Sequence, residues 1–312
     1  MLRRLALVLF ALLLPACALA GESRYAQVFD PAADDGLLSV RFLWLGPQVA
    51  DDKPGDAMIL TAPGGEVMVL DAGHPQSADY VTAALDAMGV TRIDFLVASH
   101  PHIDHIGGFP TLLSRYEVGT VCASALTYED SSYYRAFLEA LRERGIELTV
   151  LAEGDSLAFG EVTVDVLNPP REIDYPDNYP EGATQFINNQ SLALRFTWGD
   201  SSFLLAGDLY SGAERALAER WGEALDCDVM KANHHGDGTS SSLTWREAVS
   251  PEITVITSDT IEDLNVARKF TRDGQRMYHT LLDGCVRIST PGDGTYEVLT
   301  EKDRSTDLFD ET

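Results

Sequence analysis

The chain is poor in cysteine, and its cysteines are not spaced for a metal site. Four of the 312 residues are cysteine, and one of them, Cys17, lies in the apolar N-terminal stretch. The others, Cys122, Cys227 and Cys285, form no Cys-x-x-Cys pair, which excludes the common cysteine-rich zinc sites. They allow either one disulfide and a free thiol, or three buried thiols.

Positive charge is also scarce. Lysine and arginine number 23 against 49 aspartate and glutamate, which gives a formal net charge of −26. Such a surface repels polyanions and anionic membranes, so we expect no basic groove that holds a long nucleic acid. A small-molecule or phosphoester substrate held mainly by metal ions is not excluded by this charge.

Long hydrophobic runs are absent after the first 20 residues, so the sequence predicts no later transmembrane helix. Residues 1–20 (MLRRLALVLFALLLPACALA) combine two arginines, a short apolar core and small residues, which is typical of a secretory signal peptide. Ala18-Leu19-Ala20 fits a cleavage site, and attachment of a lipid anchor at Cys17 is the alternative. Both interpretations predict an exported protein, either periplasmic or extracellular.

Linker-like tracts are absent between residues 25 and 300. We therefore expect one domain over residues 21–300, followed by an acidic, fraying tail over residues 301–312. Short apolar strand patterns alternate with amphipathic helical patterns. The expected strands are residues 38–45, 57–61, 67–71, 95–99, 191–197, 203–206 and 228–232, and the expected helices are residues 77–88, 131–144 and 212–221.

One hairpin pattern occurs twice along the chain. Residues 55–73 (GDAMILTAPGGEVMVLDAG) and residues 189–208 (NQSLALRFTWGDSSFLLAGD) each contain a strand, a glycine turn, a second strand and a terminal Gly and Asp. A chance likeness between two hairpins is one interpretation. If the repeat is real, two related halves with interleaved helices fit a sandwich of two sheets covered by helices on both outer faces.

Three of the seven histidines lie within six positions in LVASHPHIDHIGG, residues 96–108. His100 and His102 are two residues apart, so in extended backbone they point to the same side and can share one metal ion. Asp104 and His105 can face a second ion, because carboxylate and imidazole both suit divalent metals. Isolated surface or core histidines are the metal-free alternative, which this dense pattern disfavours.

Two further pieces follow other expected strands. Asp208 ends the stretch FLLAGD, where a carboxylate is well placed to bridge two ions, although a turn-forming aspartate is the alternative. His234 and His235 follow the expected strand 228–232. Five of the seven histidines therefore lie in two short clusters, each at the end of an expected strand. The sixth and seventh, His74 and His279, stand apart, and we interpret His279 as structural.

These motifs together resemble the metallo-β-lactamase superfamily, and within it the hydrolase domain of ComEC-type competence proteins and their stand-alone secreted relatives. The resemblance covers roughly residues 38–295. The residues that carry it are SHPHIDHIGG (99–108), AGD (206–208) and KANHHG (231–236), supported by LDAG (70–73), NNQSL (188–192) and GCVRIST (284–290). It implies an α/β fold, a four-layer αββα sandwich, with the metal site along one edge.

The resemblance also implies a binuclear centre that holds two divalent metal ions, zinc or manganese. His100 and His102 would bind the first ion, Asp104 and His105 the second, and Asp208 would bridge the two. One histidine of the pair His234 and His235 completes the second site, with His235 preferred because it precedes a glycine. Asp71 would hold the histidine stretch by hydrogen bonds.

This chain departs from the superfamily pattern in two places. Many members supply a third histidine to the first metal from the region that here reads Asn188-Asn189-Gln190. We expect Asn188 to lie beside the first ion, whose site would be weaker, more open or tuned to manganese. The loop after the first strand is lengthened over residues 46–56, and we expect it to border the pocket.

The expected activity is that of a secreted metal-dependent hydrolase that uses metal-bound hydroxide, because a bound metal lowers the pKa of water to about 7. Phosphoesters and phosphodiesters are the favoured substrates, since relatives with this motif set include nucleases and phosphorylcholine esterases. Asp104 is the catalytic candidate that orients the water or accepts its proton. His74 and Lys231 are candidate substrate contacts, with a loop histidine and a strand-end lysine as the structural alternatives.

Two other functions remain open at this point. One is hydrolysis of a lactone or an amide by the same centre, although nothing in the sequence resembles a dedicated β-lactam pocket. The other is a non-catalytic binding protein of the cell envelope. The channel segments of ComEC-type proteins are absent from this sequence, so DNA uptake is not implied.

Overall fold

The computed structural model describes residues 23–49, 52–272 and 274–304. The expected signal peptide over residues 1–20, with Cys17, lies outside the described residues, as do residues 305–312 of the expected tail. Among the described residues, no helix is both long enough and apolar enough to cross a membrane.

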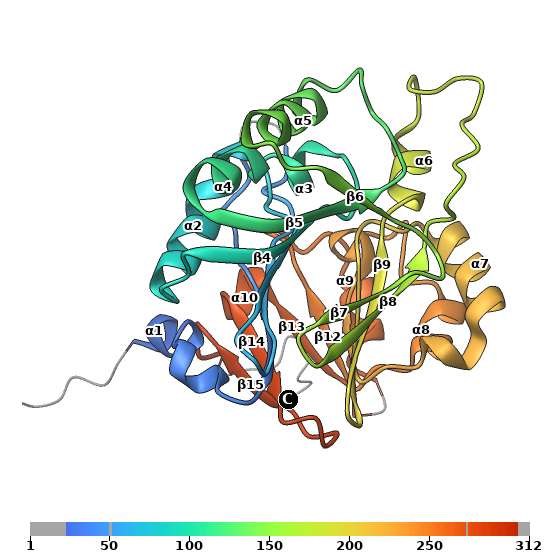
Figure 1. Ribbon diagram of the computed structural model, residues 1–312. Helices are drawn as coiled ribbons and strands as arrows, with labels where there is room; N and C mark the ends of the chain where they lie inside the picture. Colours follow the sequence, from blue (N-terminus) through green and yellow to red (C-terminus); the bar gives the residue numbers. More distant parts are fainter. Residues whose placement is uncertain (1–22, 50–51, 273, 305–312) are drawn as a thin grey trace, which may run out of the picture.

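Two mixed β-sheets form the centre of the molecule (Figure 1). The eight-stranded sheet has the order β15 (Glu297–Thr300), β14 (Val286–Thr290), β1 (Leu38–Phe42), β2 (Met58–Thr61), β3 (Val67–Leu70), β4 (Arg92–Val97), β5 (Glu117–Ser124) and β6 (Leu148–Leu151). The seven-stranded sheet has the order β13 (Arg276–His279), β12 (Ile253–Ile256), β11 (Val229–Lys231), β10 (Ser201–Ala206), β9 (Ala193–Trp198), β8 (Val162–Asn168) and β7 (Ser156–Phe159).

Helices cover the outer face of each sheet, which gives four layers (Figure 1). The larger helices on the eight-stranded sheet are α2 (Ala78–Ala87), α4 (Phe109–Arg115) and α5 (Ser132–Arg144). Those on the other sheet are α7 (Ser211–Trp221) and α8 (Leu243–Val249), with the six-residue α9 (Leu264–Lys269) beside them. The shorter helices are α1 (Arg24–Val28), α3 (Ile103–Ile106), α6 (Thr184–Asn189) and α10 (Thr280–Asp283). The expected single-domain αββα sandwich is confirmed.

Burial on both faces explains why the central strands read as continuous apolar runs. Successive side chains of a strand point to opposite faces of its sheet. In β2, Leu60 packs between the sheets while Ile59 packs under the helices. In β10, Leu205 packs between the sheets and Leu204 packs under α7 and α8. Alternation of apolar and polar residues is therefore not required in either strand.

The repeated hairpin occupies equivalent places in the two sheets. The pairs β2–β3 and β9–β10 are antiparallel, and the second strand of each hairpin begins a parallel run, β3–β4 and β10–β11. The chain after β3 carries Asp71, and the chain after β10 carries Asp208. Because parallel strands end at the same edge of a sheet, the loops after them gather chemically active side chains at that edge.

The three cysteines among the described residues are buried thiols, which decides between the two alternatives left open by the sequence. Cys122, Cys227 and Cys285 are all free and buried. Burial raises the pKa of the Cys122 thiol to about 12. Buried thiols with raised pKa values are poor nucleophiles, so these cysteines belong to the packing of the fold.

Candidate metal centre

The histidine stretch begins where β4 ends, and the Asp71 side chain holds it by hydrogen bonds. Asp71 adopts a positive φ of 59° directly after β3. Its carboxylate accepts hydrogen bonds from the backbone N of Ser99 at 2.7 Å and from the Ser99 hydroxyl at 2.6 Å. It also pairs with His105 Nδ1 at 2.8 Å. The contact with Nδ1 leaves Nε2 of His105 directed away from Asp71.

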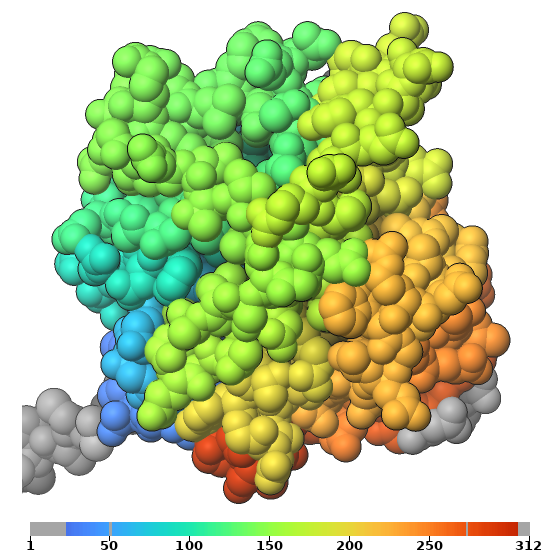
Figure 2. Space-filling view, turned by 45° about the vertical axis from the view of Figure 1, so that its right-hand side comes forward, coloured from blue at the N-terminus to red at the C-terminus, as the bar shows by residue number. Residues whose placement is uncertain are grey.

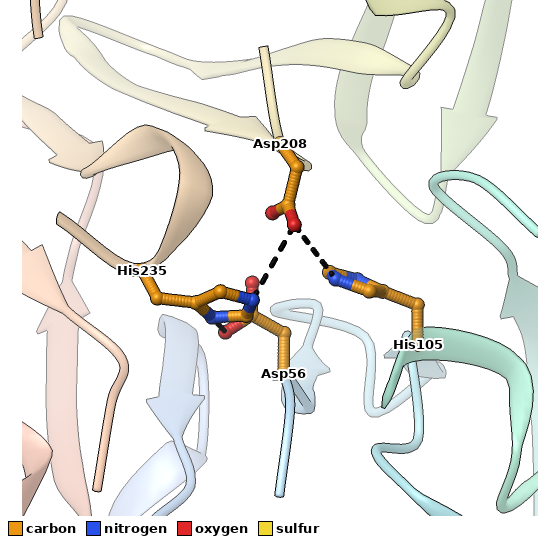
Figure 3. A group of neighbouring side chains, drawn as sticks. All are labelled: Asp56, His105, Asp208 and His235. Atoms are coloured by element: carbon orange, nitrogen blue, oxygen red, sulfur yellow. Dashed lines mark hydrogen bonds and ion pairs between the residues drawn. The ribbon is translucent and has the colours of Figure 1, made fainter. Parts of the chain in front are cut away.

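Asp208, which follows β10 of the seven-stranded sheet, contacts the histidine stretch. Its Oδ2 atom lies 3.3 Å from His105 Nε2 and 3.4 Å from His235 Nε2. Asp104 Oδ2 lies 3.3 Å from His235 Nε2 and 3.7 Å from His105 Nε2. Figure 3 shows the Asp208 carboxylate pointing between the two imidazole rings. Two carboxylates and two imidazoles from opposite halves of the chain therefore converge on one small space.

Burial without hydrogen-bond partners shows that this space fits a cation. In the described part of the chain, His105 Nε2, His235 Nε2 and Asp208 Oδ1 are buried with no hydrogen-bond partner. Ligand atoms of Asp56, His105, Asp208 and His235 all lie within 4.8 Å of one another. Imidazole nitrogens and carboxylate oxygens together suit zinc and manganese. We conclude that the donor set fits a divalent metal ion.

The electrostatics of the cluster lead to the same conclusion. Burial alone would raise the pKa of Asp208, but His235 and His105 outweigh it and lower the pKa well below its usual value. Burial alone would lower the pKa of His105, but Asp208 and Asp104 raise it well above its usual value. Buried carboxylates of this density require positive charge beside them, which a divalent ion supplies directly.

Asp56 is a member of this centre that the sequence did not reveal. Its Oδ1 atom lies 3.0 Å from His235 Nδ1 and accepts a hydrogen bond from the Thr257 hydroxyl. Its Oδ2 atom pairs with Lys231 Nζ at 2.6 Å. Asp56 therefore does for His235 what Asp71 does for His105, since it engages Nδ1 and leaves Nε2 for the centre. A carboxylate behind a metal-binding histidine fixes the orientation of the ring.

The structure distinguishes the two adjacent histidines that the sequence left open. His235 is 2% exposed, and its Nε2 faces Asp104 and Asp208. His234 Nε2 is 4.0 Å from Asp208, and its Nδ1 is 2.7 Å from the Thr239 hydroxyl. Its ring stacks on Tyr210 with centroids 4.8 Å apart. The cluster therefore takes His235, while His234 lies at its border.

The other expected ligand pair, His100 and His102, has fewer ligand atoms close to it. His100 Nε2 lies 3.0 Å from His102 Nδ1 and 4.0 Å from Asp208 Oδ2. Asn188, at the end of α6, is 1% exposed and lies within interaction range of His102 and Tyr210. Its Oδ1 atom is buried without a hydrogen-bond partner among the described residues. Asn188 therefore lies on the His102 side of the cluster.

The two candidate substrate contacts are engaged with the protein itself. Lys231 is completely buried, and its ammonium pairs with Asp56, so it supports the centre from behind. His74 is 7% exposed, and its Nδ1 accepts a hydrogen bond from the backbone N of Gln76. The structure therefore gives both residues the structural contacts that were the alternatives to a substrate role.

His279 gives a prediction that does not depend on metal. It is 1% exposed, and burial together with Arg304 lowers its pKa to about 4. In the unfolded chain the pKa of a histidine is about 6.5, so as the pH falls the unfolded chain binds the proton at a higher pH than the folded chain does. The stability present above pH 6.5 is then lost between about pH 6.5 and 4, by up to about 3 kcal/mol.

Urea unfolding of wild type and His279→Asn across this range, with a chelator present, will test the effect. The imidazoles of the metal centre titrate in both proteins, so the difference between the two pH profiles isolates His279. The variant should lose less stability between pH 6.5 and 4 than wild type. Parallel profiles would show that His279 does not carry the effect.

The protein is an α/β sandwich of two mixed sheets between helical layers. A buried histidine and aspartate cluster that could bind metal ions lies at the edge where parallel strands end. The chain belongs to the metallo-β-lactamase superfamily, a superfamily of mostly hydrolases, whose family model matches residues 50–257.

Two competence proteins are among its relatives. The chain is 28% identical over 201 residues to competence protein ComA of Neisseria gonorrhoeae, which covers 64% of this chain and 25% of the relative. It is 27% identical over 226 residues to ComE operon protein 3 of Bacillus subtilis, which covers 67% of this chain and 27% of the relative. The chain thus spans about a quarter of the length of these relatives. The predicted resemblance to ComEC-type proteins is confirmed.

Solved structures share the fold at low identity. Tm1679, described as a metal-dependent hydrolase of the β-lactamase superfamily, has a TM-score of 0.51 and 11% identity, and the match covers 78% of this chain and 95% of Tm1679. CmlA, a diiron β-hydroxylase from Streptomyces venezuelae, has a TM-score of 0.50 and 13% identity, with coverage of 81% and 54%. At these identities the likeness shows the fold alone.

Proposed function

We propose that this protein is an exported hydrolase that cleaves phosphoesters or phosphodiesters at a centre of two divalent metal ions. The observation that carries the proposal is the buried convergence of His105 Nε2, His235 Nε2 and Asp208, whose free ligand atoms fit a cation. The resemblance of the histidine motif set to that of nucleases and phosphorylcholine esterases supports phosphoesters as the substrate class. The N-terminal sequence pattern supports export.

Each side chain has a distinct task in this proposal. His105, His235, Asp104 and Asp208 would hold one ion, while His100, His102 and Asp208, with Asn188 beside them, would hold the other. Ions held there would supply hydroxide at neutral pH and would polarise the substrate's phosphoryl group. The chain's own residues do the positioning, since Asp71 and Asp56 fix the rings of His105 and His235.

Asp104 is the residue that we assign to proton handling. It is 9% exposed, whereas Asp208 is 2% exposed, so Asp104 is the more accessible of the two carboxylates facing the centre. Burial opposes its ionisation, yet His105 and His235 outweigh burial and lower its pKa. An ionised carboxylate in this place can orient an attacking water molecule and accept a hydrogen bond from it.

Metal analysis combined with hydrolysis of bis(p-nitrophenyl) phosphate tests the proposal. The mature protein is loaded with zinc or with manganese, as wild type, as Asp104→Ala and as the control Asp200→Ala, which changes an exposed residue of the β9–β10 turn. We expect about two ions per chain and turnover in wild type and in Asp200→Ala. Asp104→Ala should lose at least about 100-fold of this activity, the lower range for general-base catalysis.

The other outcomes separate the competing functions. Two ions without turnover would contradict the phosphoester assignment and direct the search to lactones and amides. Absence of bound metal under both conditions would contradict the enzyme and favour a binding protein. Equal turnover in wild type and Asp104→Ala would remove Asp104 from the mechanism.

A further inference from the structure

A cluster of aromatic rings extends outward from the metal centre on its His102 side. We call Tyr128, Tyr175, Tyr179 and Phe186 the aromatic wall. The ring of Tyr128 lies 6.2 Å from the ring of His102 and 6.2 Å from that of Tyr179. Tyr179 contacts Tyr175 at 5.0 Å and Phe186 at 5.8 Å. The wall is therefore continuous with an expected metal ligand.

Hydrogen bonds hold the wall in one arrangement. The Tyr175 hydroxyl accepts a bond from the backbone N of Thr127 at 3.0 Å, and the Tyr179 hydroxyl donates to the Thr127 carbonyl. These bonds join the segment after β5 to the segment between β8 and α6. Because the polar ends of Tyr175 and Tyr179 are occupied by Thr127, what these two side chains offer another molecule is the surface of their rings.

The rings are not sealed in a core. Tyr175 is 39% exposed, and Tyr128, Tyr179 and Phe186 are half-buried. Figure 2 shows a hollow between the green segment after β5 and the yellow-green segment that leads to α6. Partly exposed aromatic rings that are fixed in place offer a large contact area at low entropic cost.

The charge around the wall limits what it can receive. The segment 169–190 carries one arginine, Arg171, against Glu172, Asp174, Asp177 and Glu181. A long polyanion would be repelled by these carboxylates. These carboxylates would not repel a small ester that has a single phosphoryl group at the centre and an uncharged ring against the wall.

We propose that the aromatic wall binds a flat, ring-bearing alcohol group of the substrate, so that the enzyme prefers phosphoesters of ring-bearing alcohols over those of alkyl alcohols. The proposal rests on the proposed phosphoester hydrolase function. Tyr128, nearest to the centre, and Tyr179, in the middle of the wall, are the specificity-determining residues. An aromatic stack is worth a preference of about fivefold to tenfold.

Two phosphonates that cannot be hydrolysed test the proposal by binding alone. Phenylphosphonate carries a ring, and ethylphosphonate is its alkyl counterpart. Titration calorimetry on the metal-loaded protein should show that phenylphosphonate binds about fivefold to tenfold more tightly than ethylphosphonate. Tyr128→Leu and Tyr179→Leu should each reduce that ratio toward one, without weakening the binding of ethylphosphonate.

Two variants serve as controls. Tyr133→Leu removes a tyrosine that is 42% exposed on α5, similar in exposure to Tyr175, and should keep the preference. Tyr179→Phe keeps the ring and removes its bond to Thr127, so it should also keep the preference if the ring face is what binds. The Tyr179→Phe variant still tests the ring face if a leucine variant fails to fold.

Equal binding of the two phosphonates by wild type would overturn the wall as a specificity surface and leave the hydrolase standing. Survival of the preference in both leucine variants would overturn it in the same way. A different result would contradict the proposed function itself, and the wall proposal with it. In that result the metal-loaded protein binds neither phosphonate and does not hydrolyse bis(p-nitrophenyl) phosphate.

Discussion

Asp208→Asn is expected to empty the metal centre while leaving the fold in place. One oxygen of Asp208 faces His105 and His235 at 3.3 and 3.4 Å, and the same oxygen lies 4.0 Å from His100. Loss of a residue behind a ligand costs about 10–100-fold in metal affinity, so loss of Asp208, which in the proposed function would itself hold both ions, should cost more. Turnover of bis(p-nitrophenyl) phosphate should fall below detection.

The measurement is the metal content per chain after dialysis, with thermal melting of the metal-free proteins alongside. Asp200→Asn changes an exposed aspartate at the opposite end of β10 and should keep its metal. If Asp208→Asn retains metal and activity at the wild-type level, Asp208 does not bridge the centre, and the mechanism must be rebuilt on Asp104 alone.

Lys231→Met is expected to be strongly destabilising, although lysine substitutions at protein surfaces rarely are. Lys231 and Asp56 are both completely buried, and their charges meet at 2.6 Å. Removing the ammonium leaves the Asp56 carboxylate buried without its main cation, which typically costs about 3–5 kcal/mol. Urea unfolding of the metal-free variant will measure the loss directly.

A second substitution shows whether the cost comes from the uncompensated charge. Lys231→Met combined with Asp56→Asn removes both charges, so it should recover most of the lost stability. The asparagine oxygen can still accept from His235 Nδ1, and metal binding should therefore persist in the double variant. Lys269→Met, on α9 at the surface layer, is the control. A loss below about 1 kcal/mol for Lys231→Met would mean that His235 alone compensates Asp56.

The density of the histidine stretch made the metal centre predictable from sequence. Imidazoles two residues apart, followed by an adjacent carboxylate and imidazole, have few purposes other than metal binding, and the structure brings His105, Asp104, Asp208 and His235 together. Of His234 and His235, the resemblance favoured His235 because a glycine follows it, and His235 is the one that the structure has in the cluster. Both adopt positive φ, 50° and 54°, and the turn of the backbone alone decides which ring enters the centre.

The contribution of Asp56 and the role of Lys231 could not be predicted from the sequence, for a physical reason. Asp56 lies at the end of the lengthened loop and is 179 positions from His235, so no local pattern links them. Lys231 looks like a strand-end lysine facing solvent until Asp56 is placed behind it. The available hint was the expectation that the loop over residues 46–56, which ends at Asp56, borders the pocket.

Several strands with both faces buried were predictable from the sequence. Burial alone was not sufficient, since β12 and β14 are also buried throughout and were not predicted. The apolar runs of β2, β3 and β10 were found nearly to the residue, because each is buried throughout. The edge strands β6 and β7 were not predicted, since their exposed positions alternate weakly and resemble loops. The expected strand 38–45 ends at Phe42, after which the chain leaves the sheet.

The spread of the metal cluster along the chain has a consequence for how the protein folds. The cluster draws on residues 56, 105, 208 and 235, so it cannot exist in the chain until both sheets have formed and docked. An ion that binds this cluster then binds the folded chain and not the unfolded one. Each tenfold rise in free metal above the dissociation constant adds about 1.4 kcal/mol to the free energy of unfolding. The lifetime of the folded chain should therefore follow the metal supply of its surroundings.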